Sequence, residues 1–192
     1  MMQLQRSSKL VKLVALALLA ALSLILFFIS FPLPMLPPFL KVDFSDIPAL
    51  LAGLIFSPLA GVLVVFMKNL LYFVASGASD PVGVVANFIA GALFVLPVAY
   101  LYHRYRGIKS VIAGLIIGTF IMAVVMSVLN YIIILPAYSV LFGMEFDDTL
   151  KMIVVSGVLP FNFIKGIIIG VLFVPLFMKL HQWIDQKRIE AI

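Results

Sequence analysis

Residues 46–76 read DIPALLAGLIFSPLAGVLVVFMKNLLYFVAS, and the way in which this stretch is divided decides the fold. Ser57 and Pro58 mark a turn in the middle of an apolar run. A helix over residues 46–57 would be about 18 Å long, whereas the hydrocarbon core of a bilayer is about 30 Å thick. The stretch is therefore either one broken membrane helix, giving five spans, or a packed hairpin of a short and a long helix, giving six.

The remainder of the chain is equally apolar. Hydrophobic residues make up 65% of the 192 residues and charged residues 11%, against about half and about a quarter in soluble globular proteins. Lipid must therefore be the solvent. Apolar runs occur at 9–31, 46–57, 58–76, 82–103, 109–141 and 153–182. They leave room for a single transmembrane domain, 1–192, and for no soluble domain.

The distribution of charge separates five spans from six, because cytoplasmic loops carry an excess of Lys and Arg. With six spans, one side receives three basic clusters, which are Arg6, Lys9 and Lys12; Arg104, Arg106 and Lys109; and Lys179, Lys187 and Arg188. The other side receives Lys41 and Lys151 together with the acids Asp43, Asp46, Asp80, Glu145, Asp147 and Asp148. Five spans would split the basic clusters across both faces. We therefore predict an all-α membrane protein with six transmembrane helices and with both termini in the cytoplasm.

Two of the runs, 109–141 and 153–182, are longer than a span requires, so these helices should tilt, kink or project beyond the bilayer. Pro136 and Pro160 are the expected kink points, because a proline removes the helix hydrogen bond to the carbonyl four residues earlier. The first run is too long for a secretory signal and lacks a convincing cleavage site. We expect it to be retained as a helix.

Residue content disfavours several kinds of site. The chain has no cysteine, which excludes disulfides, thiolate metal sites and cysteine nucleophiles. His103 and His181 lie at polar span ends, so we expect no metal site. The net charge of +5 follows from topology and does not indicate nucleic acid. No His or carboxylate inside a span can act as a base, so we do not expect an enzyme.

Lys68 and Lys165 lie in the interior of predicted spans, where a charge costs about 3 kcal/mol or more. No Asp or Glu lies inside a span to pair with them. The alternatives are Asp43 or Asp46 at the external mouth, a bound ligand, or no counter-ion if the amine is neutral. For Lys165 our main interpretation is a ligand that completes its bonding, and the alternative is bonding to backbone carbonyls. Lys68 either serves the ligand, stabilises the hairpin or reaches toward a lipid headgroup.

Asn162 and Lys165 are three residues apart, so both project from one face of the last helix. An amide beside an ammonium suits a flat heterocycle edged with carbonyls and ring nitrogens. Asn130, Tyr131 and Asn87 are expected at a similar depth, which is typical of a small-molecule pocket with apolar walls and a few convergent polar groups. Alternatively, Asn87 and Asn130 make hydrogen bonds between helices.

Residues 31–43 read FPLPMLPPFLKVD and hold four prolines among large apolar residues. An exposed apolar loop is costly unless it covers something, so we predict a semi-rigid lid over the pocket, with a loop that plugs the bundle or lies in the interface as the alternative. Phe39, Leu40, Lys41 and Asp43 are the predicted contacts of this loop with the substrate. On the first helix, Ala17 and Ala21 lie four apart on one face and allow another helix to approach closely.

These features resemble the substrate-binding S components of energy-coupling factor (ECF) transporters, and within that family the riboflavin-specific members. The resemblance covers essentially the whole chain. It is carried by the helix count, the basic start followed by Ala17 and Ala21, the stretch from Phe31 to Pro48 that ends in Phe44-Ser-Asp-Ile-Pro48, and the pair of Asn162 and Lys165.

The resemblance implies a multi-pass subunit of a bacterial cell-membrane importer that only binds its substrate, riboflavin, and carries no cofactor. A membrane T component and two cytoplasmic ABC ATPases would complete the importer, and the chain itself has no Walker motif. By the same resemblance, Ala17 and Ala21 would dock on the T component, and Asn162, Lys165 and Asn130 would hydrogen-bond riboflavin beneath the loop. Another vitamin or flavin such as FMN, or a channel or assembly protein, remains the alternative.

Overall fold

The computed structural model describes residues 2–144, 146 and 149–190, so three of the acids assigned to the outer side, Glu145, Asp147 and Asp148, lie outside the described residues. The described helices are α1 (Met2–Phe28), α2 (Asp46–Ile55), α3 (Pro58–Ala75), α4 (Pro81–Tyr105), α5 (Gly107–Leu129), α6 (Leu135–Phe142), α7 (Leu150–Ile153) and α8 (Leu159–Glu190). Two π-helical turns, η1 (Asn130–Ile134) and η3 (Val154–Val158), join α5 to α6 and α7 to α8. The predicted all-α class is confirmed.

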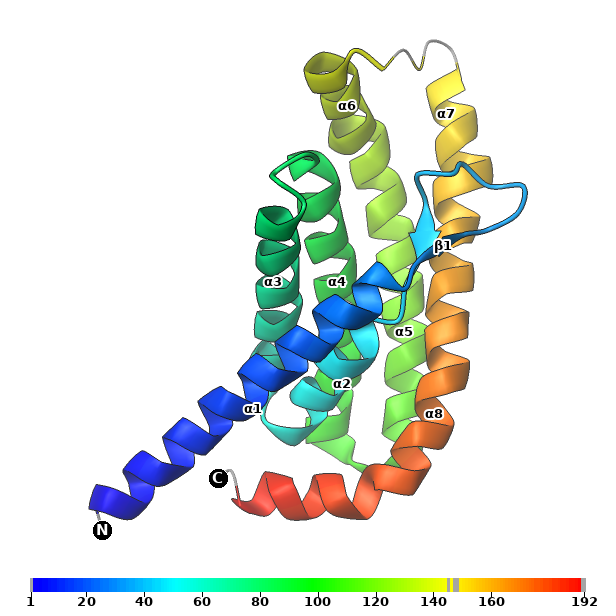
Figure 1. Ribbon diagram of the computed structural model, residues 1–192. Helices are drawn as coiled ribbons and strands as arrows, with labels where there is room; N and C mark the ends of the chain where they lie inside the picture. The colour runs from blue at the N-terminus through cyan, green and yellow to red at the C-terminus, as the bar shows by residue number, and fades with distance from the viewer. Residues whose placement is uncertain (1, 145, 147–148, 191–192) are drawn as a thin grey trace.

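The helices form an upright bundle that α1 crosses at an angle, and the start of α1 and the end of α8 lie at the same, lower end (Figure 1). Among the described residues, five helical segments are long and apolar enough to cross a membrane. Their outer faces expose large apolar side chains, for example Leu13 at 62%, Ile132 at 63% and Val171 at 66%. Such faces are stable only against lipid or another protein.

A helix cap at Ser57 divides residues 46–76, the stretch that decides the fold. The Ser57 side chain accepts a hydrogen bond from the backbone N–H of Ala60 at 3.1 Å, and Pro58 occupies the first turn of α3. A serine cap followed by proline is a strong helix start. The stretch is therefore two helices.

The short helix α2 is surrounded by protein. Eight of its ten residues are buried, and all of these except Asp46 are apolar. Close packing against α3 and α4 depends on Gly61, where a Cβ atom would lie 2.7 Å from Cγ1 of Val95 and 2.9 Å from the carbonyl oxygen of Ala49. A helix too short to cross the bilayer is tolerated because its neighbours shield its ends from lipid.

The two expected kink points coincide with the π-helical turns. η1 ends two residues before Pro136, and η3 ends two residues before Pro160. A proline cannot donate its helix hydrogen bond, and a π-turn is one way in which a helix accommodates the lost bond. Both irregular turns lie in the upper half of the bundle, close to the predicted pocket residues.

Helix α8 runs past its predicted end at residue 182 and continues to Glu190. Pro175 lies inside it, and the end of the helix turns aside and lies across the bottom of the bundle (Figure 1). Ile184 is fully buried there, and the Tyr102 hydroxyl donates to Oδ1 of Asp185 at 2.6 Å. The helix continues because its end packs on the bundle although the apolar run has stopped.

The close contact of Gly114 on α5 with α4 leads to a testable prediction about stability. A Cβ atom at Gly114 would lie 2.6 Å from Cα of Val98, whereas a Cβ atom at Gly170 of α8 would meet nothing closer than Cδ1 of Leu115 at 3.9 Å. We expect Gly114→Ala to destabilise the protein by about 1–3 kcal/mol through overpacking. The matched control Gly170→Ala should be neutral or slightly stabilising, since alanine favours a helix. Thermal unfolding in detergent measures both, and equal melting temperatures for the two variants would contradict the packing.

Candidate functional site

The segment between α1 and α2, residues 29–45 and here called loop one, folds back into the bundle. Its two ends pair as a short antiparallel ladder, β1 (Phe31–Pro32) with β2 (Lys41–Val42), with Phe31 opposite Val42 and Pro32 opposite Lys41. After β2 the chain enters the interior, where Val42 is 0% and Asp43 is 1% exposed. The ladder therefore places a carboxylate inside the bundle.

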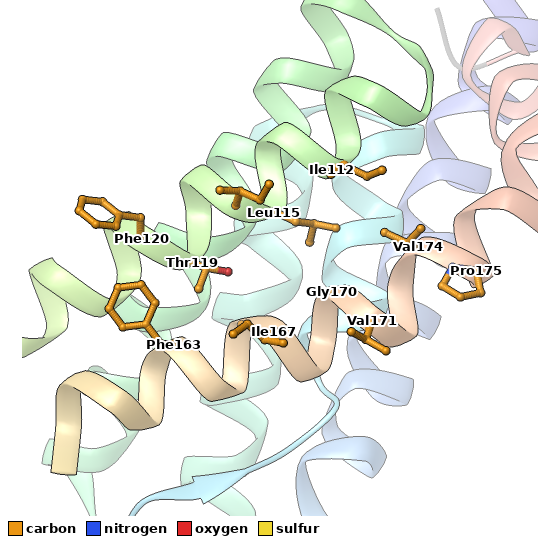
Figure 2. A pocket seen from close by; sticks show the side chains of 12 residues that line it. Ile112, Leu115, Thr119, Phe120, Phe163, Ile167, Gly170, Val171, Val174 and Pro175 are labelled. Carbon is orange, nitrogen blue, oxygen red and sulfur yellow. The ribbon is translucent and has the colours of Figure 1, made fainter. Parts of the chain in front are cut away.

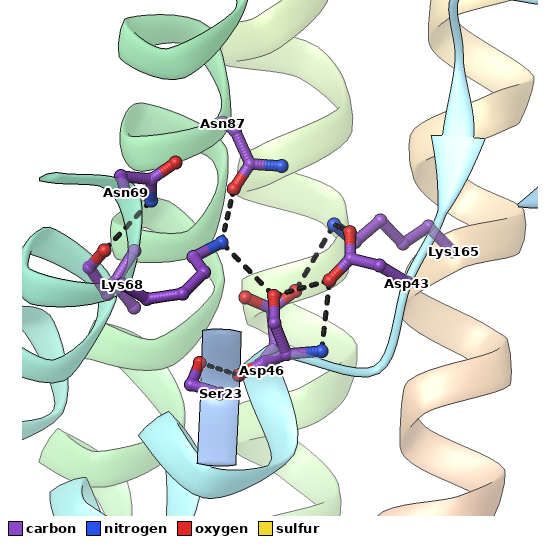
Figure 3. Close-up of polar contacts among 9 residues, drawn as sticks. Ser23, Asp43, Asp46, Lys68, Asn69, Asn87 and Lys165 are labelled. Atoms are coloured by element: carbon purple, nitrogen blue, oxygen red, sulfur yellow. Dashed lines mark hydrogen bonds and ion pairs between the residues drawn. The ribbon is translucent and has the colours of Figure 1, made fainter. Parts of the chain in front are cut away.

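A buried polar cluster lies where loop one meets the helices. It consists of Asp43 and Ser45 from loop one, Asp46 at the start of α2, Lys68 of α3 and Lys165 of α8, each at most 4% exposed. Nζ of Lys165 lies 3.0 Å from Oδ2 of Asp43 and 3.4 Å from Oδ2 of Asp46. Figure 3 shows both carboxylates between the two lysines.

Lys68 completes the other half of the cluster. Its Nζ donates to Oγ of Ser45 at 3.1 Å and to Oδ1 of Asn87 on α4 (Figure 3). It also lies 4.4 Å from the centre of the Phe27 ring. The Ser45 hydroxyl and backbone N–H both donate to Oδ1 of Asp43. On α1, Oγ of Ser23 donates to the carbonyl oxygen of Ser45 at 2.6 Å. The cluster thus ties loop one to α1, α3, α4 and α8.

The cluster is balanced in charge, with the carboxylates of Asp43 and Asp46 facing the ammonium groups of Lys68 and Lys165. Burial raises the pKa of the Asp43 carboxyl, but the nearby Lys165 and Lys68 and the hydrogen bond from Ser45 together lower that pKa below its ordinary value. The carboxylate is therefore ionised, as a buried ion pair requires.

These contacts correct the main interpretation of the lysines. The expectation that a ligand supplies the missing partner of Lys165 is wrong, because Asp43 and Asp46 supply it, and the alternative that named these two acids is confirmed. Lys68 does not reach toward a headgroup, since it is only 1% exposed. Asn87 accepts a bond from Lys68, which confirms the alternative of a hydrogen bond between helices. The predicted topology placed Asp43 and Asp46 at the outer mouth of the bundle, whereas loop one brings both carboxylates into its interior.

Asn162 and Asn130 lie beside the π-helical turns and use their amides in the same way. Nδ2 of Asn162 donates to the carbonyl oxygen of Val158, and Nδ2 of Asn130 donates to that of Met126, both at 2.8 Å. Both side chains are buried, and within the described part of the chain neither amide oxygen has a hydrogen-bond donor. Each asparagine therefore keeps an acceptor and one N–H for another partner.

The remaining predicted contacts lie at different depths. Leu40 packs against a small apolar cluster of Leu135, Val154 and Val158 near the π-helical turns. In contrast, Phe39 is 50% and Tyr131 51% exposed, and the structure does not bring either side chain to the polar cluster. Lys41 lies exposed in β2. Loop one therefore enters the bundle through Leu40 and Asp43.

Similarity to known proteins identifies the family. The family model described as ECF transporter, substrate-specific component, matches residues 11–177. The chain belongs to this family. The riboflavin transporter FmnP of Bacillus subtilis (strain 168) is 47% identical over 184 residues, which cover 94% of this chain and 97% of that protein. The riboflavin transporter RibU of Staphylococcus aureus (strain TCH60) is 46% identical over 179 residues, which cover 93% of each chain.

The fold agrees with this family. A solved structure of the S component of a bacterial ECF transporter superposes with a TM-score of 0.79 at 44% identity, covering 91% of this chain and 98% of that one. The relatives are transporters and not enzymes. With its apolar helices, the chain is a multi-pass S component of the bacterial cell membrane.

A wide apolar groove of this S component lies away from the polar cluster. It runs along the outside of α5 and α8 and has a volume of about 640 Å³. Figure 2 shows its walls, which include Ile112, Phe120, Phe163 and Val171, with Thr119 supplying a hydroxyl. It contains none of the charged or amide side chains described above. The groove therefore lacks the chemistry that would orient a polar ligand.

Ala17 and Ala21 are both exposed on α1, whereas Ala20 between them is 1% exposed and faces the bundle. The small-residue face therefore points outward and is open to a partner helix.

Sequence reasoning missed Ser45, which connects both halves of the polar cluster. Its only signal was a serine between two acids just before a helix.

The buried ion pair between Asp43 and Lys165 leads to a prediction about the stability of the S component without ligand. We expect Asp43→Asn to destabilise it by about 3–5 kcal/mol, because Lys165 then loses a buried counter-ion. The control Lys41→Ala lies two residues away at an exposed position and should change stability by less than about 0.5 kcal/mol. Melting temperatures in detergent without added ligand measure the difference. An Asp43→Asn variant as stable as Lys41→Ala would show that the pair does not hold loop one.

Proposed function

We propose that the chain captures riboflavin from outside the cell as the substrate-binding subunit of an ECF importer. The observation that carries the proposal is near-full-length similarity, at 46–47% identity, to two proteins that are named riboflavin transporters. Riboflavin is then the transported substrate and not a cofactor. The geometry of the upper bundle supports this assignment.

The substrate contacts in this proposal are Asn162, Lys165 and Asn130. The flavin ring presents an imide N–H between two carbonyls, and an asparagine amide offers the complementary acceptor and donor. Lys165 has three N–H donors, of which one bonds Oδ2 of Asp43, while Oδ2 of Asp46 lies 3.4 Å away as an ion pair without a hydrogen bond. A further donor can bond a ring carbonyl or nitrogen. The proposed ligand therefore adds to the ion pair and does not replace it.

Loop one acts as the lid in this proposal. Leu40 packs against Leu135 and Val158. Leu135 comes five residues after Asn130, and Val158 comes four residues before Asn162. Gly157 of η3 leaves room for Pro37, whose Cδ would lie 3.1 Å from a Cβ atom there. Phe39, Leu40 and Lys41 are proposed to border the ligand, and Tyr131 is proposed to move or to contact it from outside.

The membrane topology in this proposal has six spans, with α2 paired to α3 and with both termini in the cytoplasm. The start of α1 and the end of α8 lie at one end of the bundle, as an even number of crossings requires (Figure 1). Lys9, Arg104, Arg106 and Lys179 belong to segments at that end. An excess of Lys and Arg on one side marks the cytoplasmic side.

The partners in this proposal are a membrane T component and two ABC ATPases, since the family is the substrate-specific part of a transporter. The exposed face of α1 around Ala17 and Ala21 is the proposed docking surface. Small residues four apart allow close helix contact, which is the main source of association in lipid.

Riboflavin binding tests the proposal directly. The purified protein in detergent should quench riboflavin fluorescence with a stoichiometry of one, and riboflavin should raise its melting temperature. Asn162→Ala should weaken binding by about 1–3 kcal/mol, because a buried ligand group loses its partner. The matched control is Asn69→Ala on α3, whose Nδ2 makes the same bond, to Val65, at 2.8 Å.

Each outcome of this titration has a distinct meaning. Equal losses in Asn162→Ala and Asn69→Ala would indicate a general effect on the helices and would remove Asn162 from the site. FMN serves as the competitor that tests the breadth of flavin recognition. If neither flavin changes fluorescence or melting temperature of the folded wild-type protein, the chain is not a flavin-binding subunit.

Docking on a T component predicts a separation of binding from transport. Ala17→Trp with Ala21→Trp should leave riboflavin affinity unchanged within about twofold but abolish uptake in cells, since the bulky rings block close helix contact. Ile116→Trp, at a position of α5 that is 66% exposed, is the control for a ring added to the outer surface and should transport normally. Normal uptake by the double variant would rule out this face as the docking surface.

A further inference from the structure

We propose that Lys68 is a positioning residue for the substrate: acting through Ser45, it orients Asp43 and thereby directs the Lys165 ammonium toward the ligand. The inference rests on the proposed function, because it assigns a role in riboflavin binding. Lys68 itself lies on α3 and contacts Ser45, Asn87 and Phe27, and not Asn162, Lys165 or Asn130, the hydrogen-bonding substrate contacts proposed above.

The direction of the hydrogen bonds follows from the donor inventory. A lysine ammonium can only donate, so in the bond between Lys68 and Ser45 the hydroxyl oxygen is the acceptor. The single hydroxyl proton of Ser45 is then directed to its other partner, Oδ1 of Asp43. Without Lys68 the hydroxyl could rotate and use its proton elsewhere. Lys68 therefore fixes the polarity of the bond that holds Asp43.

The two oxygens of Asp43 have separate tasks. Oδ1 receives the hydroxyl and the backbone N–H of Ser45, the latter at 2.9 Å, while Oδ2 receives Nζ of Lys165 at 3.0 Å. Rotation of the carboxylate would exchange or break these bonds. Oδ2 of Asp43 accepts one of the three N–H donors of Lys165, and Oδ2 of Asp46 lies 3.4 Å from the same nitrogen without a hydrogen bond, so the orientation of Asp43 decides where the other donors point.

Lys68 is held firmly enough to impose this order. Its side chain is 1% exposed, and its ammonium also donates to Oδ1 of Asn87 and lies against the Phe27 ring. An ammonium with two fixed acceptors and an aromatic face has little freedom to move. Figure 3 shows the resulting path from Asn87 through Lys68 to Asp43 and Lys165.

A double-mutant cycle on riboflavin affinity tests the inference, with Lys68→Met, Ser45→Ala and the double variant titrated in detergent. Lys68→Met keeps the length of the side chain and removes its donors. Each single change should weaken riboflavin binding about tenfold, and the double variant should bind no more weakly than the weaker single one, because both changes break the same path. Dissociation of riboflavin should accelerate in all three. Asn69→Ala, next to Lys68 on the same helix, is the control that should bind as the wild type does.

The outcomes separate this inference from a structural role and from failure of the proposed function. If Lys68 only stabilised the fold, Lys68→Met would lower the melting temperature while the folded fraction bound normally, or its loss of affinity would multiply with that of Ser45→Ala. Either result overturns the inference. If Lys68→Met does not fold, Lys68→Gln takes its place with the opposite expectation: because it keeps an N–H donor for Ser45, it should bind riboflavin more tightly than Ser45→Ala does, and a loss equal to that of Ser45→Ala would overturn the inference. A wild-type protein that does not bind riboflavin refutes the proposed function, whereas binding that is unchanged in the Lys68 variant refutes only the role of Lys68.

Discussion

The buried ion pair between Asp43 and Lys165 is the interaction on which the upper half of the molecule depends. A lone ammonium within an apolar bundle is expensive, and a partner must reach it. That partner comes from loop one, so the charge of a helix in the last third of the chain determines where a loop in the first third must fold. Lys68, Ser45 and Asp46 extend the pair into a balanced cluster that holds α1, α3, α4 and α8 to the same point. The S component thus pairs its charged side chains in the interior of the bundle and exposes apolar side chains to lipid.

Much of the architecture could be predicted because it is encoded locally. Apolar runs predict membrane helices whatever their neighbours are, and Ser57 with Pro58 divides the critical stretch through a cap made within four residues. Pro136 and Pro160 mark the irregular turns for the same reason, since a missing N–H acts on its own helix. Lys165 was identified as a charge inside a predicted span and Asn162 from its spacing of three residues, and the structure places both buried on α8.

The partners of those side chains could not be predicted, because they depend on how far loop one descends. Asp43 and Asp46 lie next to the membrane surface in sequence, yet the ladder between β1 and β2 returns the chain into the bundle. The continuation of α8 to Glu190 was missed for a similar reason. The burial of Ile184 and the bond from Tyr102 to Asp185 are long-range contacts, and the local sequence pattern does not predict them.

The π-helical turns of the upper bundle have a consequence for how such a protein can diversify. A π-turn accommodates one extra residue and rotates everything above it by about a quarter turn or more relative to the helix below. Gain or loss of a single codon at η1 or η3 would therefore present a different set of side chains around Asn130 or Asn162. The lower parts of α5 and α8, with their close contacts to neighbouring helices, would keep their register. With the substrate site proposed above, such a change would alter the side chains next to the ligand while the lower helical framework stays the same.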